Sequence, residues 1–239
     1  MLRPYLLLLT VCVSGTVCAQ LTYQVTAIRK EIAIDGKWDK PVWEKVKPIK
    51  IENRMGEEPR FRPVTEAKMV YDANNVYVIF RVHDKFVKST VTTYNGNVSG
   101  DSCVEFFFSP NSAEPGHYFN LEINAGGTPL IYFITKPGTA STKLSDTLID
   151  QIEIAHSLPG VVNPEITEEV TWTIEYRIPL EILKQFTNVT MPNPGITWRA
   201  NFYKTGSLTS NPHYYTWSPV SNPEPNFHLP AYFGTLNFN

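Results

Sequence analysis

Two short stretches of the chain bring together side chains that could do chemistry. GDSCVEFFFSP (residues 100–110) carries the thiol of Cys103 and the carboxylate of Glu105, and YFNLEINA (118–125) carries Glu122. The two glutamates could act as the acid and the nucleophile of a glycosidase. Cys103 could act as a nucleophile if a histidine activated it. Alternatively, both stretches could form a polar surface that binds a ligand without changing it.

The arrangement of these groups favours ligand binding over catalysis. Jelly-roll glycosidases usually place their acids at alternate positions of one strand, whereas the same-face neighbours of Glu105 are Cys103 and Phe107. The five histidines are scattered along the sequence, and none stands in a recognisable cysteine-hydrolase context. A lone strand cysteine is more often a small buried side chain than a reactive thiol. A glycoside hydrolase that uses Glu105 and Glu122 is kept as the alternative function.

Further polar groups share single faces of the expected strands, because successive side chains of a strand point to opposite sides of the sheet. Short amide and carboxylate side chains suit fixed hydrogen bonds to hydroxyl groups better than they suit solvation. The same rows could also be the solvated outer faces of antiparallel strands. The polar faces of YFNLEINA and of ITWRANFYK (196–204) carry Asn120, Glu122, Asn124, Arg199 and Asn201.

Metal binding is only weakly indicated. The sequence has no HExxH motif and no cysteine and histidine pairing, which argues against zinc. YDANN (71–75) and HDKF (83–86) place oxygen ligands in loops, where a structural calcium ion could bind. Asx-type turns explain the same residues without a metal. We therefore expect no cofactor, with structural calcium as the alternative.

The elements that must position these groups are strands. The chain has 19 prolines and 13 glycines, and the segments between them alternate with a period of two. The pattern predicts a single all-β domain, an antiparallel β-sandwich or jelly roll with about ten or eleven strands. Two short helical turns are expected at 38–46 and 180–186. The expected strands are 30–35, 66–72, 75–84, 102–108, 118–125, 129–135, 150–156, 169–179, 196–204, 213–217 and 234–238.

The first residues predict export. A basic start, an apolar run and the small residues Val17 and Ala19 form a signal peptide over residues 1–19, which leaves 20–239 as the mature domain. The residues GTV before Cys18 lack the small residue normally required ahead of a lipidated cysteine, which argues against a lipid anchor. A net charge of −2 and the lack of basic runs argue against nucleic acid as a partner. After the signal, no apolar stretch has the length of a transmembrane helix.

Six motifs in order resemble one family. They are IDGKWDKPVWEKV, VYDANNVYVIFRVHD, DSCVEFFFSP, YFNLEINAGGT, WTIEYRIPLEIL and FHLPAYFGTLNF. Together they are similar to the family 9 carbohydrate-binding modules and their relatives of the DOMON type, over roughly residues 25–238. The resemblance implies a β-sandwich without a catalytic centre, often attached to glycan-degrading enzymes. In the best-known branch of the family, two aromatic rings hold the terminal sugar of a chain and polar groups bind its hydroxyls.

The resemblance also assigns roles by position. The acid of the D-S-x-x-E motif is Glu105, and the asparagine of the following strand is Asn124. Glu122 stands where the family commonly has a basic residue, so the contacts with the sugar must differ here. Phe227 stands at the aromatic position before the terminal FG motif, whereas Ser99 stands where a tryptophan is expected. The second ring of the clamp is therefore missing from its usual position, and Tyr94, Tyr203 or Trp217 could supply it.

The sequence thus predicts a secreted or periplasmic, non-catalytic protein that binds a glycan or its terminal sugar and assists polysaccharide degradation. Its partners would be a carbohydrate and glycan-degrading enzymes. A second alternative is a haem-binding DOMON-type module with Met55, Met69 or Met191 as axial ligands. The predicted ligand-binding residues are Glu105, Asn120, Glu122 and Asn124, with Arg199, Asn201 and Lys204 in support and Trp217 and Phe227 as stacking surfaces.

Overall fold

The computed structural model describes residues 21–239. The predicted signal peptide, its predicted cleavage site and Cys18 lie outside the described residues. Within residues 21–239, no helix reaches the length and apolar character that crossing a membrane requires.

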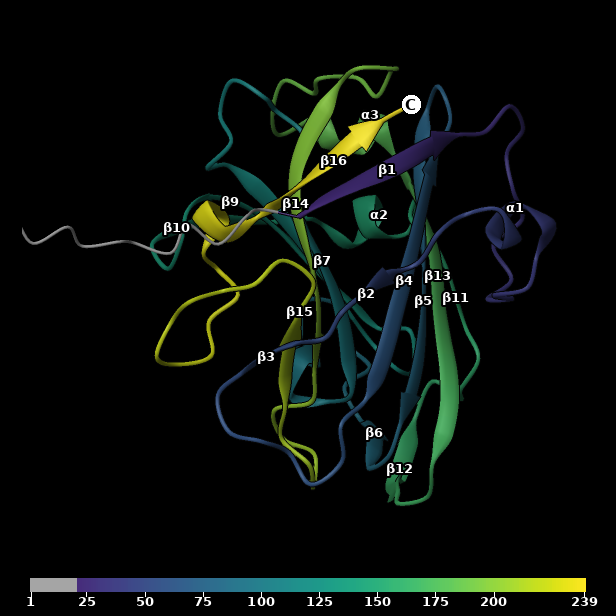
Figure 1. The fold of residues 1–239 in the computed structure, drawn as a ribbon, viewed down its shortest axis with the longest axis vertical. Helices are drawn as coiled ribbons and strands as arrows, with labels where there is room; N and C mark the ends of the chain where they lie inside the picture. Colours follow the sequence, from purple (N-terminus) through teal and green to yellow (C-terminus); the bar gives the residue numbers. More distant parts are fainter. Residues whose placement is uncertain (1–20) are drawn as a thin grey trace, which may run out of the picture.

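The strands form two facing layers that belong to one curled sheet (Figure 1). One layer has the order β10 (Ala140–Lys143), β9 (Pro129–Lys136), β8 (Tyr118–Asn124), β7 (Cys103–Ser109), β14 (Thr197–Thr205) and β16 (Gly234–Phe238). The other has the order β4 (Val64–Tyr71), β5 (Asn75–Asp84), β13 (Val170–Pro179) and β11 (Glu153–His156). β1 (Thr22–Ala27) links them by pairing in parallel with both β16 and β4. Apart from β1, the pairings within these layers are antiparallel, as the sequence predicts.

Short elements complete the layers and close their ends. β15 (Tyr214–Thr216) pairs with β14 and with β3 (Asn53–Met55), and β2 (Ile49–Lys50) pairs with β4. β6 (Val87–Ser89) and β12 (Val162–Ile166) form a separate pair. The helical turns are α1 (Pro41–Glu44), α2 (Asp146–Ile149), α3 (Leu180–Leu183), η1 (Val98–Gly100) and η2 (Pro230–Tyr232).

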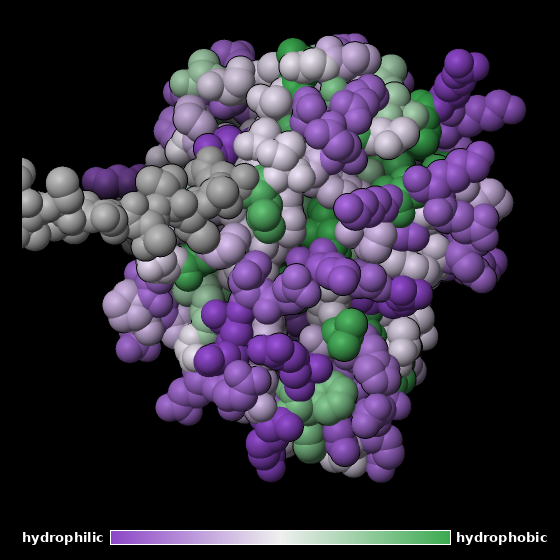
Figure 2. Space-filling view, in the orientation of Figure 1, coloured by the Kyte–Doolittle hydropathy of each residue, from purple (hydrophilic) through white to green (hydrophobic). Residues whose placement is uncertain are grey.

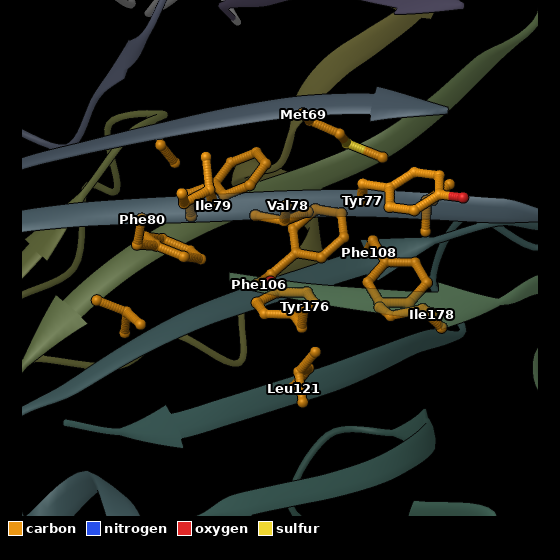
Figure 3. Close-up of a cluster of buried hydrophobic side chains, with 14 of the residues drawn as sticks. Met69, Tyr77, Val78, Ile79, Phe80, Phe106, Phe108, Leu121, Tyr176 and Ile178 are labelled. Atoms are coloured by element: carbon orange, nitrogen blue, oxygen red, sulfur yellow. The ribbon is translucent and has the colours of Figure 1, made fainter. Parts of the chain in front are cut away.

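The main core lies between the two layers. In Figure 3, apolar side chains of β4 and β5 lie close to those of β7, β8 and β13. Phe106 stacks on Phe202 of the neighbouring strand, with ring centroids 4.6 Å apart, and Phe202 in turn lies 6.0 Å from Phe80 of the facing layer. Strand alternation therefore sends Phe106 and Phe108 into this core and leaves Glu105 and Phe107 on the outer face of β7.

Most of the expected strands are confirmed, and one is wrong. The segment 30–35 forms no strand, because its end is used as a loop that binds Glu175 of β13. Gly36 follows with a φ of +74°, a conformation that other residues rarely adopt, and its N–H also donates to Glu175. The sequence also missed β1 and several strands of two to five residues. Both predicted helical turns are confirmed as α1 and α3.

Candidate ligand-binding site

A polar hollow of about 250 Å³ lies on the outer face of the layer that contains β7, β8 and β14. The outward side chains of β7 and β8 form one part of it. The rest comes from η1, the segment that joins β14 to β15, β15 itself, and the long segment 217–229, which is yellow at the left of Figure 1. The lining residues are Ser99, Glu105, Phe107, Glu122, Thr205, Ser207, Tyr214, Pro225, Asn226, Phe227 and His228.

Two buried glutamates lie side by side in this hollow. Glu105 of β7 is directly opposite Glu122 of β8 in the antiparallel register. Such cross-strand partners point to the same face of a sheet, with Cβ atoms about 4.5–5.5 Å apart. Glu105 is only 2% exposed and Glu122 only 7% exposed. The strand register thus joins two acids that are 17 residues apart in the sequence into one carboxylate pair.

Few hydrogen-bond donors of the described chain reach the carboxylate pair. Glu122 Oε1 accepts a hydrogen bond of 3.0 Å from Asn120 Nδ2, and Asn120 Oδ1 accepts one of 3.0 Å from the Tyr132 backbone N–H. Asn120 is therefore held in a fixed orientation beside Glu122. The Glu105 carboxylate receives no hydrogen bond from residues 21–239. Its acceptor capacity is open to whatever enters the hollow.

Burial and mutual repulsion make both acids reluctant to ionise. Burial raises the pKa of Glu105 well above its ordinary value, and the neighbouring Glu122 raises it further. Burial raises the pKa of Glu122 to about 7, against the opposing effect of hydrogen bonds from Asn120 and Ser99. The two groups interact closely, so their titration belongs to the pair. Near neutral pH, the pair is expected to share a proton.

Aromatic rings form the apolar part of the hollow. The Phe227 ring stacks on the Tyr203 ring with centroids 4.2 Å apart and planes 16° from parallel. The Tyr203 hydroxyl also donates a hydrogen bond to the Phe227 carbonyl. Tyr203 therefore holds Phe227 in place by ring stacking and by this hydrogen bond. His228 lies 5.1 Å from Phe107 and hydrogen-bonds through Nδ1 to the Tyr118 hydroxyl. Phe227 is thus a ring in a fixed position next to the carboxylate pair.

The structure brings four of the nine predicted binding residues together. Glu105, Glu122 and Phe227 line the hollow, and Asn120 hydrogen-bonds to Glu122. Their role in binding a ligand stays a prediction. The other five predicted residues lie outside the hollow: Asn124, Arg199, Asn201, Lys204 and Trp217.

Two asparagines outside the hollow use their side chains within the fold. Asn124 Nδ2 donates to the Val91 carbonyl and to Asp101, and its Oδ1 accepts the Thr128 N–H. Asn201 likewise joins β14 to the Ser218 backbone through both its amide nitrogen and its oxygen. Both amides are fully buried and hydrogen-bonded. They position backbone segments, and a direct hydrogen bond to a ligand would break those contacts.

The two basic residues and the tryptophan also have structural contacts. Arg199 donates to the carbonyls of Phe233 and Gly234 at the start of β16. Trp217 is buried and meets the edge of Phe202, so it packs in the core rather than beside Phe227.

Lys204 lies on the inner side of its strand and forms a buried ion pair with the facing layer. Its Nζ is 3.0 Å from Asp84 Oδ2 of β5 and 2.7 Å from His213 Nε2. His213 Nδ1 lies 2.6 Å from the Asn211 carbonyl, so Nδ1 carries the hydrogen and Nε2 accepts from Lys204. Burial lowers the pKa of His213 to about 3, consistent with a neutral ring. The Lys204 charge is thus balanced by Asp84.

Sequence reasoning missed most of the loop residues of the hollow. Ser99 had a signal, because it stands where the family resemblance expects a tryptophan. Its backbone carbonyl accepts hydrogen bonds from both the backbone N–H and the hydroxyl of Ser207. Thr205 of β14, Tyr214 of β15 and His228 gave no recognisable signal, because only the folded chain brings them to the hollow.

Packing and turns account for the thiol, for one of the two loops considered for calcium and for two of the three methionines considered for haem. Cys103 is buried, and burial raises the pKa of its thiol, so the thiolate form is disfavoured. In the first loop considered for calcium, Asp72 Oδ1 accepts the N–H groups of Asn74 and Asn75, which is an Asx-type turn. Of the methionines considered for haem, Met69 is fully buried in the main core and Met55 packs in the cluster that contains Phe227.

A second, larger hollow of about 460 Å³ lies beside β1 and α1. Its lining is mainly apolar and includes Ile28, Ile32 and Val42. In Figure 2, apolar atoms are visible at the upper right, near β1 and α1, while polar side chains cover most of the rest of this face. A site for a polar ligand needs converging hydrogen-bonding groups. The smaller hollow with the carboxylate pair meets that requirement better.

Comparisons with known proteins agree with the fold. The sequence profile of carbohydrate-binding family 9 matches residues 39–238. A presumed carbohydrate-binding protein from Bacteroides uniformis ATCC 8492 has 25% sequence identity and a TM-score of 0.82, over 92% of this chain and 100% of that chain. A search of curated proteins gives no match to this chain.

Two further solved structures share the fold at low identity. Both are family 9 modules from Caldicellulosiruptor kristjanssonii. The one in complex with cellotriose has 16% identity and a TM-score of 0.61, over 91% of this chain and 93% of that chain. The one in complex with glucose has 15% identity and a TM-score of 0.60, over 90% and 95%.

The two-layer sandwich and the family match define a carbohydrate-binding module, a class of protein that binds glycans without transforming them. Because the family profile covers most of the sequence, the chain belongs to carbohydrate-binding family 9. The prediction of a non-catalytic binding protein is confirmed, and the glycoside hydrolase alternative is not supported.

Proposed function

We propose that the hollow between β7, β8 and segment 225–228 binds one sugar residue. Glu105 and Glu122 accept hydrogen bonds from its hydroxyls, and Asn120 holds Glu122 in position. Phe227 offers a flat apolar face to the sugar ring. The volume of about 250 Å³ is below the roughly 300–1,000 Å³ of pockets for drug-sized ligands. A hollow of this size suits a single sugar residue.

The observation that carries this proposal is the unused acceptor capacity of Glu105. Buried polar groups are nearly always hydrogen-bonded, and leaving one unpaired costs about 1–3 kcal/mol. Glu105 is 2% exposed, faces the hollow and has no donor from the described part of the chain. A ligand that carries several hydroxyl donors satisfies it. The supported Phe227 ring lies close enough to line the same hollow.

The absence of a second stacking ring at Ser99 limits the expected affinity. Each net hydrogen bond contributes only about 0.5–1.5 kcal/mol, and one ring supplies only one apolar face. We therefore expect modest affinity for a single sugar. The small Ser99 side chain also leaves that side of the hollow free for a longer or substituted ligand.

A glycan array followed by isothermal titration calorimetry tests this function. The panel includes glucose and cellotriose, the ligands bound by the two Caldicellulosiruptor modules. We expect at least one saccharide to bind the wild type, and Glu122→Ala and Phe227→Ala each to weaken binding about tenfold or more. The exposed Glu168→Gln variant changes one charge elsewhere and should bind like the wild type.

Thermal unfolding of all variants confirms that each is folded at the assay temperature. If no saccharide binds the folded wild type, the proposed function is wrong. If binding survives both hollow variants unchanged, the sugar site lies elsewhere on the molecule.

We also propose that the protein is exported and assists glycan-degrading enzymes outside the cytoplasm. The support is the sequence pattern of residues 1–19 and the family of the chain. Cell fractionation and N-terminal sequencing test the proposal. The expected mature protein begins at Gln20 and carries no lipid. A cytoplasmic protein that retains Met1 would contradict export.

A further inference from the structure

The charge of the hollow is unusual for a site that binds a neutral sugar. Two carboxylates lie side by side in it, and none of its lining residues is a lysine or an arginine. The nearest buried cation, Lys204, pairs with Asp84 between the layers. Within residues 21–239, therefore, no basic side chain forms an ion pair with Glu105 or Glu122.

The histidine in the hollow does not supply the missing positive charge. Burial lowers the pKa of His228 below its ordinary value, so its ring is neutral at neutral pH. Its Nδ1 is engaged with the Tyr118 hydroxyl. The remaining lining groups are hydroxyls, an amide, a proline and the aromatic rings, which carry no charge. The hollow as a whole is acidic.

A like-charged buried pair has two ways to lower its energy. It can hold a proton, which removes one charge, or it can bind a cation, which compensates the charge. A hydroxyl donor satisfies the hydrogen bonds of Glu105 but adds no positive charge, which leaves only Lys204, already paired with Asp84, to oppose the charge of Glu105. An ammonium group supplies three donors and a positive charge together. Faces of aromatic rings such as Phe227 also attract cations.

We infer that the hollow selects a sugar with a free ammonium group, an amino sugar, over the same sugar with a hydroxyl or an N-acetyl group at that carbon. This inference rests on the proposed function and names its ligand class. The ammonium lies between Glu105 and Glu122, while the sugar ring faces Phe227. A hydroxyl at that carbon removes the charge without adding bulk, whereas an N-acetyl group removes the charge and adds bulk, so the two comparisons together separate charge from size.

Binding should release a proton. The pair that shares a proton in the free protein ionises fully when the ammonium enters, and that proton passes to the solvent. Cys103 and Tyr203 also lie near the pair, but burial raises the pKa of both, so each keeps its proton at neutral pH and neither supplies the released one. The charged and titratable groups on the packed elements are Asp101, Cys103, Tyr118, Tyr132, Lys143, Tyr203, Lys204, Tyr214 and His228.

The test compares three probes that differ at one carbon: D-glucosamine, D-glucose and N-acetyl-D-glucosamine. Calorimetry at neutral pH, in two buffers with different ionisation enthalpies, gives both the affinity and the protons released. We expect D-glucosamine to bind about tenfold or more tightly than the other two, since hydrogen bonds to charged groups are the stronger ones. It alone should release a proton.

Matched variants attribute the selectivity to the pair. Glu122→Gln and Glu105→Gln keep the shape and remove a charge, so each should reduce the preference for D-glucosamine to about threefold or less and abolish proton release. Glu168→Gln should keep both. Equal affinity of the wild type for glucose and glucosamine would overturn the inference and leave the proposed function standing. No binding of any sugar would overturn both.

One further probe separates sugars from other ammonium ligands. A peptide lysine side chain also carries an ammonium group, although it has no ring to lie against Phe227. Nα-acetyl-lysine amide should therefore bind at least about tenfold more weakly than D-glucosamine. Equal or tighter binding of the lysine probe would contradict the assignment to amino sugars.

Discussion

Two regions of the molecule bury glutamates, and they differ in the hydrogen bonds that the buried carboxylates receive. Glu175 of β13 is fully buried on the outer side of its layer. Its oxygens accept hydrogen bonds from the N–H groups of Asp35 and Gly36, the ammonium of Lys40 and the indole N–H of Trp43, at 2.6–2.9 Å. Glu105, equally buried, receives no hydrogen bond from residues 21–239.

The difference separates a structural carboxylate from one that we propose binds a ligand. The donors of Glu175 come from the loop and helix at 35–43, so this one side chain attaches that segment to β13. Proline at the first position of α1 suits the start of a helix and brings Trp43 into place. Glu105 and Glu122 hold no comparable segment. Their unused capacity opens into the hollow, so burial alone does not show what a buried acid does.

The largest effect is expected from removing the structural carboxylate, Glu175. Glu175→Ala removes the acceptor of two backbone N–H groups and of the Trp43 indole, and it removes one of the two carboxylate partners of Lys40. It should therefore lower the free energy of unfolding by about 3–5 kcal/mol. Glu105→Gln removes a charge that has no protein partner and should change stability by about 1 kcal/mol or less, or raise it. Urea unfolding measures both. Equal losses in the two variants would contradict the distinction.

The pH dependence of stability gives the next largest effect. The pKa of Glu122 is raised from 4.5 to about 7 in the folded protein, so the folded state holds its proton longer than the unfolded state. The resulting stability is fully present below about pH 4.5 and is lost as the pH rises through about 7. A shift of this size corresponds to at most about 3 kcal/mol.

Glu122→Gln should remove the loss of stability that the wild type shows as the pH rises through about 7. His213, whose pKa is lowered from 6.5 to about 3, contributes the opposite slope below about pH 6.5 in both proteins. The difference between the wild-type and variant curves therefore isolates the carboxylate pair. Urea unfolding at several pH values between 4 and 8 measures it. Parallel curves would show that the pair does not hold an extra proton.

Neighbouring asparagines allow a sharper comparison within one strand. Asn124→Ala removes hydrogen bonds to Val91, Asp101 and Thr128, so it should lower stability by about 1–3 kcal/mol while sugar affinity changes little. Asn120→Ala should mainly weaken sugar binding, because Asn120 orients Glu122. Unfolding and calorimetry on both variants check the two effects. The reverse pattern would show that Asn124 contacts the ligand.

The smallest effect is expected from a substitution that adds a second aromatic ring to the hollow. Ser99→Trp places an indole where the family resemblance expects one, in the hollow that Phe227 also lines. An aromatic contact contributes about 0.5–1.5 kcal/mol, so affinity for a bound sugar should rise by about threefold. Calorimetry measures it, with Ser99→Ala as the control. A loss of binding would show that the hollow has no room for a second ring.

The sequence predicted the sandwich and the outward direction of Glu105 because strand alternation depends on local pattern. Phe106 and Phe108 lie in the core and Phe107 faces the hollow, as a period of two requires. The segment 30–35 was wrong because its pattern resembles a strand, and only the distant Glu175 shows that it is a loop.

The site itself could be predicted only in part. Glu105 and Glu122 are neighbours because of strand register, which the alternating pattern does not determine alone. Asn124 and Asn201 have the residue types of a sugar site, but the loops that use their hydrogen bonds become visible only in the fold. Lys204 shows the limit most clearly, since its charge is matched by Asp84 from the facing layer.

The most direct test is a crystal structure with a bound saccharide, using the ligand that calorimetry finds tightest. The account predicts the sugar in the hollow, with polar groups within hydrogen-bond distance of Glu105 and Glu122 and its ring against Phe227. A sugar bound instead in the apolar hollow beside β1 and α1, with the carboxylate pair untouched, would contradict it.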